Sequence, residues 1–311
     1  MSLSTVDAFK HIRSDRCIEL NDVQLRQLQR VLMDILDDIC TICDENGILY
    51  ELGGGSALGC YREHDFIAWD DDIDINMPRA DYERFVPLFR ERFGSRYWVH
   101  TPQDTPDHGL LLSRVVRKGT SVVTREDFYN REAGAFVDVF VIENTYDSPV
   151  LRRIHELGCM AYGFLVSCRK FYRDRKPLME LARSTGDAEL IRKFRVKIRI
   201  GRLLAWRSLD ALVRRGDRWN GRCRNECSRY VVIPTGRRLF RGELYRREEL
   251  CETREYLYGG KLRRCPAAIE RYLSRLYGSD FMTPPPPEQR ERHVFFRPFD
   301  LGGLGLTDRE S

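Results

Sequence analysis

Four aspartates lie within five positions, in the stretch WDDDIDINM (69–77). Carboxylates this close repel one another, and each resists burial unless a positive group neutralises it. Ile73 and Ile75 alternate with Asp72 and Asp74, which favours a half-buried strand over a solvated acidic loop. The stretch therefore predicts a bound cation.

A third carboxylate completes a candidate metal site. Asp72 and Asp74 fall on one face of the predicted strand, because side chains alternate along a strand. Asp138 is the only carboxylate in the apolar middle of a later predicted strand, AFVDVFVIEN (135–144). Hard ions such as Mg²⁺ or Mn²⁺ prefer all-oxygen sites and also bind substrate phosphates. We therefore predict that these three aspartates bind metal and catalyse a phosphoryl transfer.

A glycine turn precedes the acidic strand. Gly53, Gly54, Gly55 and Ser56 form the turn into which a short predicted strand (48–54) runs, and a helix opens there. Small residues let backbone N–H groups approach a phosphate, so Gly54, Gly55 and Ser56 are predicted to bind substrate. A glycine run or a buried aspartate alone has ordinary structural explanations, but the ordered combination is far more specific.

The same residues resemble three signature blocks of the LicD family. The first is LGGGSALGCYREHDFIAWDDDIDINMPRADYERF (52–85), similar to a Gly-Gly-Thr-Leu-Leu-Gly turn that leads through an Arg to a Trp-Asp-Asp-Asp-Ile-Asp strand. The second is GAFVDVFVIENTYD (134–147), similar to a Gly-x-x-(Ile/Val)-Asp-(Ile/Val)-Phe strand. The third is YLSRLYGSDFMTPPPPEQRERH (272–293), similar to a block of Tyr-Gly, Met, paired prolines, Arg and His.

The resemblance implies a nucleotidyltransferase-like fold and transfer of a phospho-alcohol, commonly phosphocholine from CDP-choline, to a cell-surface glycan, with release of CMP. Fukutin-type ribitol-phosphate transferases look like relatives. Arg62 stands at the family's arginine and is expected to pair with a diphosphate oxygen. Ser56 replaces the usual Thr and keeps its hydroxyl. The loop 63–68 departs from the family pattern, which leaves its substrate contacts open.

The two remaining aspartates of the run have separate expectations. By alternation, Asp70 shares the face of Asp72 and is predicted to contact substrate, whereas Asp71 falls on the opposite face. A choline ammonium would be bound by aromatic side chains. The candidates are Trp69, Phe128, Tyr129, Phe171, Tyr172 and Trp206.

Helical and alternating patterns divide the chain into three parts. They predict an α/β (α+β) fold with a nucleotidyltransferase-like mixed sheet core and helical insertions. Residues 1–149 form the catalytic core with an N-terminal helix (20–46), and residues 150–230 form a basic helical segment. Residues 231–311 complete the core, and we expect the tail 300–311 to be poorly ordered.

Charge is distributed very unevenly along the chain. Residues 1–150 carry a net charge of −11, residues 151–230 carry +13 and residues 231–311 carry +3. The basic segment is either a solvated face or a surface for an anionic membrane or a lipid-linked acceptor. The proposed cleft is acidic, so nucleic acid is not an expected partner.

The location is predicted to be cytoplasmic, at most peripheral to the inner face of a membrane. The first 17 residues lack the apolar region of a signal peptide, and GCMAYGFLVSC (158–168) is too short to span a bilayer.

Several alternatives remain open from the sequence. An NTP-dependent nucleotidyltransferase would use the same metal site and release pyrophosphate, and a non-catalytic membrane-surface scaffold is a third reading. Arg292 and His293 either close the active site or form a structural cap. A zinc site at Cys40, Cys43, Cys223 and Cys227 is weighed against ordinary reduced core cysteines.

Overall fold

The computed structural model describes residues 17–290 and 293–306 of the 311. Arg292 and the last five positions of the predicted tail lie outside the described residues. The preceding part of the tail packs against the rest of the chain: Leu301 is buried, and Arg30 Nη1 donates a 2.6 Å hydrogen bond to the carbonyl of Gly305. No helix in the described part is long and apolar enough to cross a bilayer.

The centre of the molecule is a mixed sheet whose main strands run in the order β2-β3-β7-β5-β4. β3 and β7 are parallel, whereas the other pairs of strands in this sheet are antiparallel. Two short strands, β8 and β9, extend the sheet from the far end of β7. The bounds are β2 Glu51–Leu52, β3 Ile73–Pro78, β4 Tyr97–His100, β5 Ser113–Arg117, β7 Phe136–Asn144, β8 Tyr230–Val232 and β9 Leu244–Arg246. The predicted α/β class is therefore confirmed.

The acidic strand is shorter than the sequence pattern predicted. β3 begins at Ile73, although the pattern predicts a strand over 67–78. The N–H of Asp70 donates to the carbonyl of Ile67 at 2.8 Å, which closes a turn before the strand. Alternation therefore applies to Asp74 but cannot place Asp70 or Asp71.

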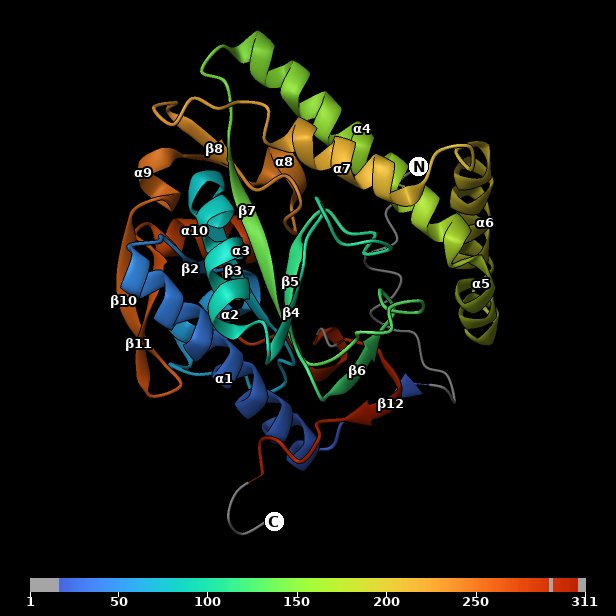
Figure 1. Ribbon diagram of the computed structural model, residues 1–311, viewed down its shortest axis with the longest axis horizontal. Coiled ribbons are helices and arrows are strands. Elements are labelled where there is room, and N and C mark those ends of the chain that lie inside the picture. The colour runs from blue at the N-terminus through green and yellow to red at the C-terminus, as the bar shows by residue number, and fades with distance from the viewer. Residues whose placement is uncertain (1–16, 291–292, 307–311) are drawn as a thin grey trace.

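Three helices cover the part of the sheet that carries the acidic residues. They are α1 Asp22–Asn46, α2 Gly54–Arg62 and α3 Arg79–Phe93. α1 begins with a capping box formed by Asn21 and Gln24 and ends at Gly47, whose positive φ suits the left-handed cap. Its apolar stripe, which includes Leu32, Ile35 and Ile39, is fully buried in the main core. Figure 1 shows α1 crossing one side of the sheet.

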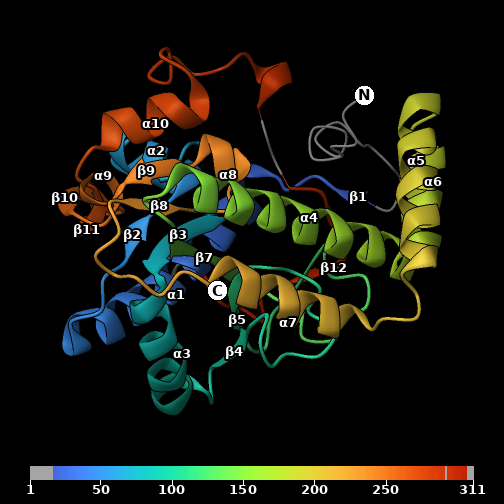
Figure 2. The same ribbon diagram turned by 90° about the horizontal axis from the view of Figure 1, so that it is seen from above.

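The basic segment forms four helices outside the sheet. They are α4 Pro149–Arg173, α5 Arg175–Ser184, α6 Ala188–Leu203 and α7 Leu209–Asn220. Figure 1 shows them as an arc along the upper and right edges, and Figure 2 shows α4 in front of the sheet with α5 and α6 side by side. They bury small apolar clusters of their own, such as Phe171, Leu178 and Phe194.

The C-terminal part returns to the main core. Tyr258, Cys265 and Leu273 are buried there beside residues of α1 and β3. A second sheet joins β12 to β1 and β6. The bounds are β1 Cys17–Ile18, β6 Ser121–Thr124, α8 Leu239–Gly242, α9 Arg247–Leu250, β10 Thr253–Tyr258, β11 Lys261–Pro266, α10 Ile269–Tyr277, a 3₁₀ turn Pro287–Gln289 and β12 Phe295–Asp300.

The ten cysteines all lie in the described part, and no disulfide joins them. Cys40 and Cys43 are buried on α1, where Cys40 Sγ donates to the hydroxyl of Tyr50 at 3.0 Å. Cys223 is buried and Cys227 is exposed. Among the described residues, the only group with the geometry to hold a metal contains no cysteine. The four cysteines considered for zinc are therefore not gathered into a site.

A buried histidine makes the stability of the fold sensitive to acid. Burial lowers the pKa of His108 to about 3, while its Nε2 donates to the carbonyl of Leu112 at 2.7 Å. The unfolded chain takes up a proton below about pH 6.5, and the folded chain does not. We expect His108 by itself to lower the free energy of unfolding by about 1.4 kcal/mol for each pH unit well below 6.5.

Urea denaturation at a series of pH values between 7 and 4 would measure this slope. His108→Gln, which keeps a donor for the Leu112 carbonyl, should flatten it. His64→Asn is the matched control, because His64 is exposed and its positive φ suits Asn. An unchanged slope in His108→Gln would show that other groups cause the acid sensitivity.

Candidate active site

The three predicted carboxylates meet at the start of the two parallel strands. Asp74 of β3 and Asp138 of β7 are direct register partners, so both side chains point to the same face of the sheet. Asp72 precedes the strand by one residue and lies close enough to interact electrostatically with Asp138. Residues 66 positions apart in the chain are thus brought into one acidic cluster.

The cluster holds more negative charge than its surroundings neutralise. Burial, then the carboxylates of Asp72 and Asp138, raise the pKa of Asp74 well above its ordinary value. Burial and the charge of Asp72 do the same to the pKa of Asp70. One carboxylate oxygen of Asp70 is buried without a hydrogen-bond partner among the described residues. A divalent cation that binds to these carboxyl groups would readily displace their protons.

His293 joins the cluster from the far end of the chain. The ring Nδ1 of His293 lies 2.8 Å from Asp71 Oδ1 and 3.7 Å from Asp72 Oδ2. Its backbone N–H donates to Asp71 Oδ2 at 2.9 Å. Ligand atoms of the three residues lie within 4.8 Å of one another, a spacing that could hold a metal ion. Burial by itself lowers the pKa of His293, but the two carboxylates outweigh it and raise the pKa to about 10.

Asp71 therefore differs from its prediction. Strand alternation predicts that it lies opposite Asp72, yet both residues contact His293, because the regular strand begins only at Ile73. From the sequence, His293 is expected either to close the active site or to form a structural cap. Its position in the third signature block is the feature of the sequence that points to a place in the active site.

Arg114 is a site residue that the sequence pattern missed. It pairs with Asp138 across the antiparallel strands β5 and β7, and its Nε donates to Asp138 Oδ1 at 2.7 Å. Its Nη1 reaches Asp127 Oδ2 at 3.4 Å, and the guanidinium lies 3.9 Å from the centre of the Phe136 ring. Burial raises the pKa of Asp138, and Arg114 opposes that effect. Arg114 thus orients Asp138 and favours its charged form.

The glycine turn packs directly on the acidic residues. Gly54 has a φ of +47°, and a Cβ there would lie 2.6 Å from Asp74 Oδ2. A Cβ at Gly55 would lie 2.9 Å from Asp70 Oδ2. Ser56 is buried, and its Oγ accepts a 2.9 Å hydrogen bond from the N–H of Asp74. The turn is built of small residues because the carboxylates occupy the space that side chains would need.

A second set of residues that the sequence pattern did not predict holds the glycine turn against α10. The hydroxyl of Tyr272 accepts from the N–H of Gly54 at 2.9 Å and from Asn76 Nδ2 at 3.4 Å. Asn76 Nδ2 also donates to Glu51 Oε1 at 3.2 Å. Burial raises the pKa of Glu51 well above its ordinary value and so favours the protonated form of this carboxyl.

Arg62 lies at the opposite end of α2 from the turn. Eight residues separate it from Gly54, which is roughly 12 Å along the helix axis. Its Nη1 donates to the carbonyl of Phe281 at 3.0 Å and its Nε to Glu63 Oε1 at 2.8 Å. Its Nη2 is buried and has no hydrogen-bond partner in the described part of the chain. The structure therefore does not bring Arg62 into contact with the carboxylates, although one donor remains for a ligand.

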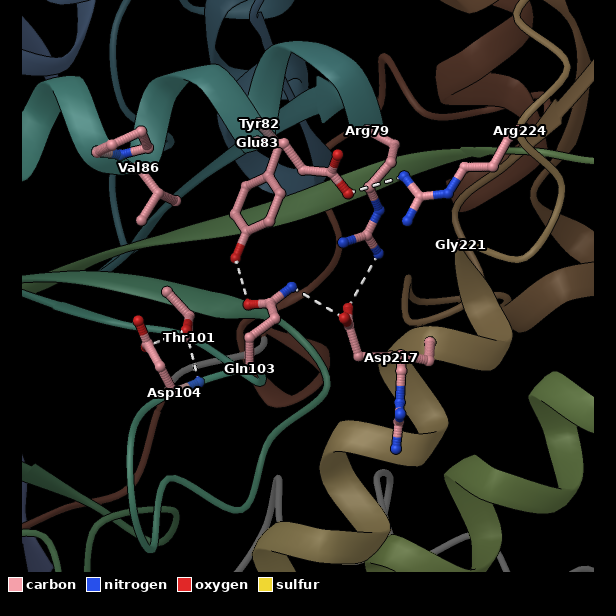
Figure 3. Close-up of a pocket in the computed structure, with 12 residues that line it drawn as sticks. Arg79, Tyr82, Glu83, Val86, Thr101, Gln103, Asp104, Asp217, Gly221 and Arg224 are labelled. Carbon is pink, nitrogen blue, oxygen red and sulfur yellow. Dashed lines mark hydrogen bonds and ion pairs between the residues drawn. The ribbon is translucent and has the colours of Figure 1, made fainter.

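A cavity of about 370 Å³ lies at the other ends of β3 and β7 (Figure 3). There the buried Arg79 is hydrogen-bonded to both oxygens of Glu143, and its Nη2 donates to Asp217 of α7 at 2.9 Å. Gln103 joins this group, donating to Asp217 at 2.9 Å and accepting from Tyr82 at 3.0 Å. Arg79, the first residue of α3, lies five positions after Asp74, which is roughly 16 Å along the strand, so the cavity is distinct from the acidic cluster.

Gly54→Ala tests the contact between the turn and Asp74. The new methyl group would clash with Asp74 Oδ2, and alanine is strained at this φ. We expect at least a hundredfold loss of transfer activity and about 1–2 kcal/mol of lost stability. Gly163→Ala is the control, because a Cβ there meets nothing within 4 Å. Near-normal activity in Gly54→Ala would show that the turn tolerates a displaced Asp74.

The site combines carboxylates on the parallel pair of a mixed sheet with a glycine turn at the N-terminus of a helix. Residues 47–150 match the family model described as LicD/FKTN/FKRP, nucleotidyltransferase domain. This match falls on the part of the chain that holds the first two blocks of the resemblance to the LicD family.

A named relative is similar to this chain over a comparable length. The chain is 30% identical over 131 residues to the lipopolysaccharide cholinephosphotransferase LicD of Haemophilus influenzae. The match covers 42% of this chain and 48% of that protein, so the chain spans about half the length of the curated relative it matches.

Proposed function

We propose that the protein is a divalent-metal-dependent phosphotransferase. It moves phosphocholine, or a similar phospho-alcohol, from a CDP-alcohol to a cell-surface glycan precursor and releases CMP. The observation that carries the proposal is the convergence of Asp72, Asp74 and Asp138 beside the glycine turn, inside the segment that matches the LicD family. The relative's printed name supports phosphocholine as the transferred group.

The residues of the cluster fit a hard divalent ion. Asp72, Asp74 and Asp138 offer carboxylate oxygens, the ligands that Mg²⁺ and Mn²⁺ prefer. The raised pKa of Asp74 reflects burial and uncompensated neighbouring charge, which a cation would relieve. When bound, the ion would neutralise the diphosphate and the departing CMP.

The remaining steps fall to backbone and side-chain groups of this chain. The backbone N–H groups of Gly55 and Ser56, in the first turn of α2, favour a bound phosphate oxygen. Asp138, held by Arg114, or another carboxylate of the cluster accepts the proton of the acceptor hydroxyl. The acceptor oxygen then bonds to the distal phosphorus, and the bond from phosphorus to the bridging oxygen breaks with its electron pair leaving on CMP.

Trp69 is the aromatic candidate that adjoins the acidic run. Its ring centre lies 4.2 Å from the guanidinium of Arg290, a position that a choline ammonium could also occupy. Trp206, in contrast, is 72% exposed on the connection between α6 and α7. Phe171 is buried in the helical cluster.

Thermal unfolding of the purified chain with Mg²⁺ or Mn²⁺ and candidate donors tests the proposal. The donors are CDP-choline, CDP-ribitol, CDP-glycerol, CTP and ATP. We expect a rise in Tm that requires both the metal and one CDP-alcohol, because only a ligand bound to the folded state stabilises it. EDTA should reverse the rise, and Asp74→Asn should abolish it.

The other outcomes separate the alternatives. A rise with CTP or ATP alone would indicate an NTP-dependent nucleotidyltransferase. The description of the matching family model contains the term nucleotidyltransferase domain. No rise with any donor would argue for a non-catalytic scaffold. Release of CMP from the stabilising donor, measured by mass spectrometry with a glycan acceptor, would complete the assignment.

A further inference from the structure

α4 presents apolar side chains to solvent along its outer face. The helix buries one face, with His155, Cys159 and Val166, against the rest of the molecule. The opposite face carries large apolar side chains that are between 37% and 69% exposed: Val150, Leu151, Ile154, Leu157, Met160 and Phe164. Spacings of three and four residues align most of them in one stripe.

The stripe is uncharged between basic ends. From Ile154 to Cys168, roughly 21 Å of helix, the only acidic or basic residue other than His155 is Glu156, which is buried. Arg152 and Arg153 precede this stretch, and Arg169, Lys170 and Arg173 follow it. This stretch includes the apolar segment 158–168, which is too short to span a bilayer.

A second exposed apolar group lies beside the C-terminal half of α4. Leu203 and Trp206, on the connection between α6 and α7, are more than 70% exposed. Arg169 Nε of α4 donates to the carbonyl of Arg207 at 3.0 Å, which fixes this connection against the helix. The Arg207 guanidinium lies 4.3 Å from the centre of the Trp206 ring. Figure 1 shows α4 and this connection along the same upper part of the molecule.

The positive charge of the basic helical segment indicates which kind of partner this surface binds. Residues 151–230 carry a net charge of +13, so an interface between two copies would bring like charges together. An anionic bilayer offers the opposite charge together with an apolar layer for the stripe. We propose that this surface docks on an anionic membrane, with α4 lying in the plane of the interface. The inference does not depend on the proposed activity.

Flotation of the full chain with lipid vesicles tests this docking. We expect binding to vesicles of phosphatidylcholine mixed with phosphatidylglycerol, weaker binding at high salt, and little binding to phosphatidylcholine alone. Ile154→Gln/Leu157→Gln should lower the partition coefficient roughly a hundredfold, because each side chain loses burial in the lipid. Leu257→Gln/Leu262→Gln, at exposed positions of the β10–β11 hairpin, is the matched control and should bind normally.

Tryptophan fluorescence supplies a second readout on the same vesicles. We expect a blue shift on binding that is lost in Trp206→Phe. Several results would overturn the proposal: no binding to anionic vesicles, equal binding to neutral vesicles, or normal binding by Ile154→Gln/Leu157→Gln. Self-association of the wild-type chain that this double variant abolishes, measured by light scattering without lipid, would instead identify an interface between copies.

Discussion

Replacing Asp74 with Asn should lower the transfer rate by at least about a thousandfold while leaving the fold intact. Asp74 is the central carboxylate of the cluster, next to Asp138 in the sheet and against Gly54 in the turn. Asn keeps the shape of the side chain but removes the charge that would bind a metal ion. Loss of one electrostatic group aimed at the reacting centre typically costs about 10²–10³ in rate, and loss of a metal ligand should cost more.

The same substitution should not reduce the stability of the metal-free protein. Burial and neighbouring carboxylates raise the pKa of Asp74, so the folded state favours its protonated form. Such a group costs stability as the pH rises above its unfolded value of about 3.9, and Asn removes that cost at neutral pH. We therefore expect an equal or higher Tm without metal, together with a lost response to Mg²⁺.

Transfer assays and thermal unfolding on the same preparation would measure both effects. Asp107→Asn is the matched control, since the Asp107 side chain is 72% exposed and its backbone conformation also suits Asn. Activity near that of the control in Asp74→Asn would remove the acidic cluster from the reaction. A large fall in Tm would show instead that the charge of Asp74 is structural.

Replacing Arg79 with Met should lower the free energy of unfolding by about 3–5 kcal/mol. Arg79 is buried between Glu143 and Asp217, and Met would leave both carboxylates buried without their cation. Burial raises the pKa of Glu143, and Arg79 opposes this effect, so the variant should favour the protonated carboxyl. The loss should therefore shrink as the pH is lowered.

Urea denaturation of Arg79→Met and of Arg92→Met would isolate the effect of the buried charge. Arg92 is exposed on the same helix, so its substitution should change stability by less than about 0.5 kcal/mol. Arg79→Lys keeps one positive charge and should recover part of the loss. Equal effects at positions 79 and 92 would show that the buried network contributes nothing to the stability of the junction between sheet and helices.

Local sequence determined the parts of the site that lie close together in the chain. The glycine turn and the Asp72-x-Asp74 pair occupy one short stretch, so chain connectivity keeps them close together, and strand alternation predicts the face of Asp74. Helix α1 follows from apolar periodicity and capping residues, and α3 follows from its apolar periodicity. Asp138 was found because a lone carboxylate is conspicuous in an apolar strand.

Tertiary structure decided which distant residues complete the site. Asp138 receives Arg114 from β5, Gly54 is fastened by Tyr272 of α10, and Asp71 meets His293 from near the C-terminus. Alternation misplaced Asp71 because a turn closed by a backbone hydrogen bond precedes the strand. No period in the sequence encodes such contacts, since they depend on how elements far apart in the chain pack together.

The outer face of α4 shows the same division. The sequence determines that the helix is apolar around much of its surface and that its neighbourhood is basic. It cannot tell which apolar face meets the core, because a buried stripe and an exposed stripe have the same composition and period. Only the packing of α4 against α6 and α7 leaves Ile154, Leu157 and Phe164 in solvent, since those neighbours cover the opposite face of the helix.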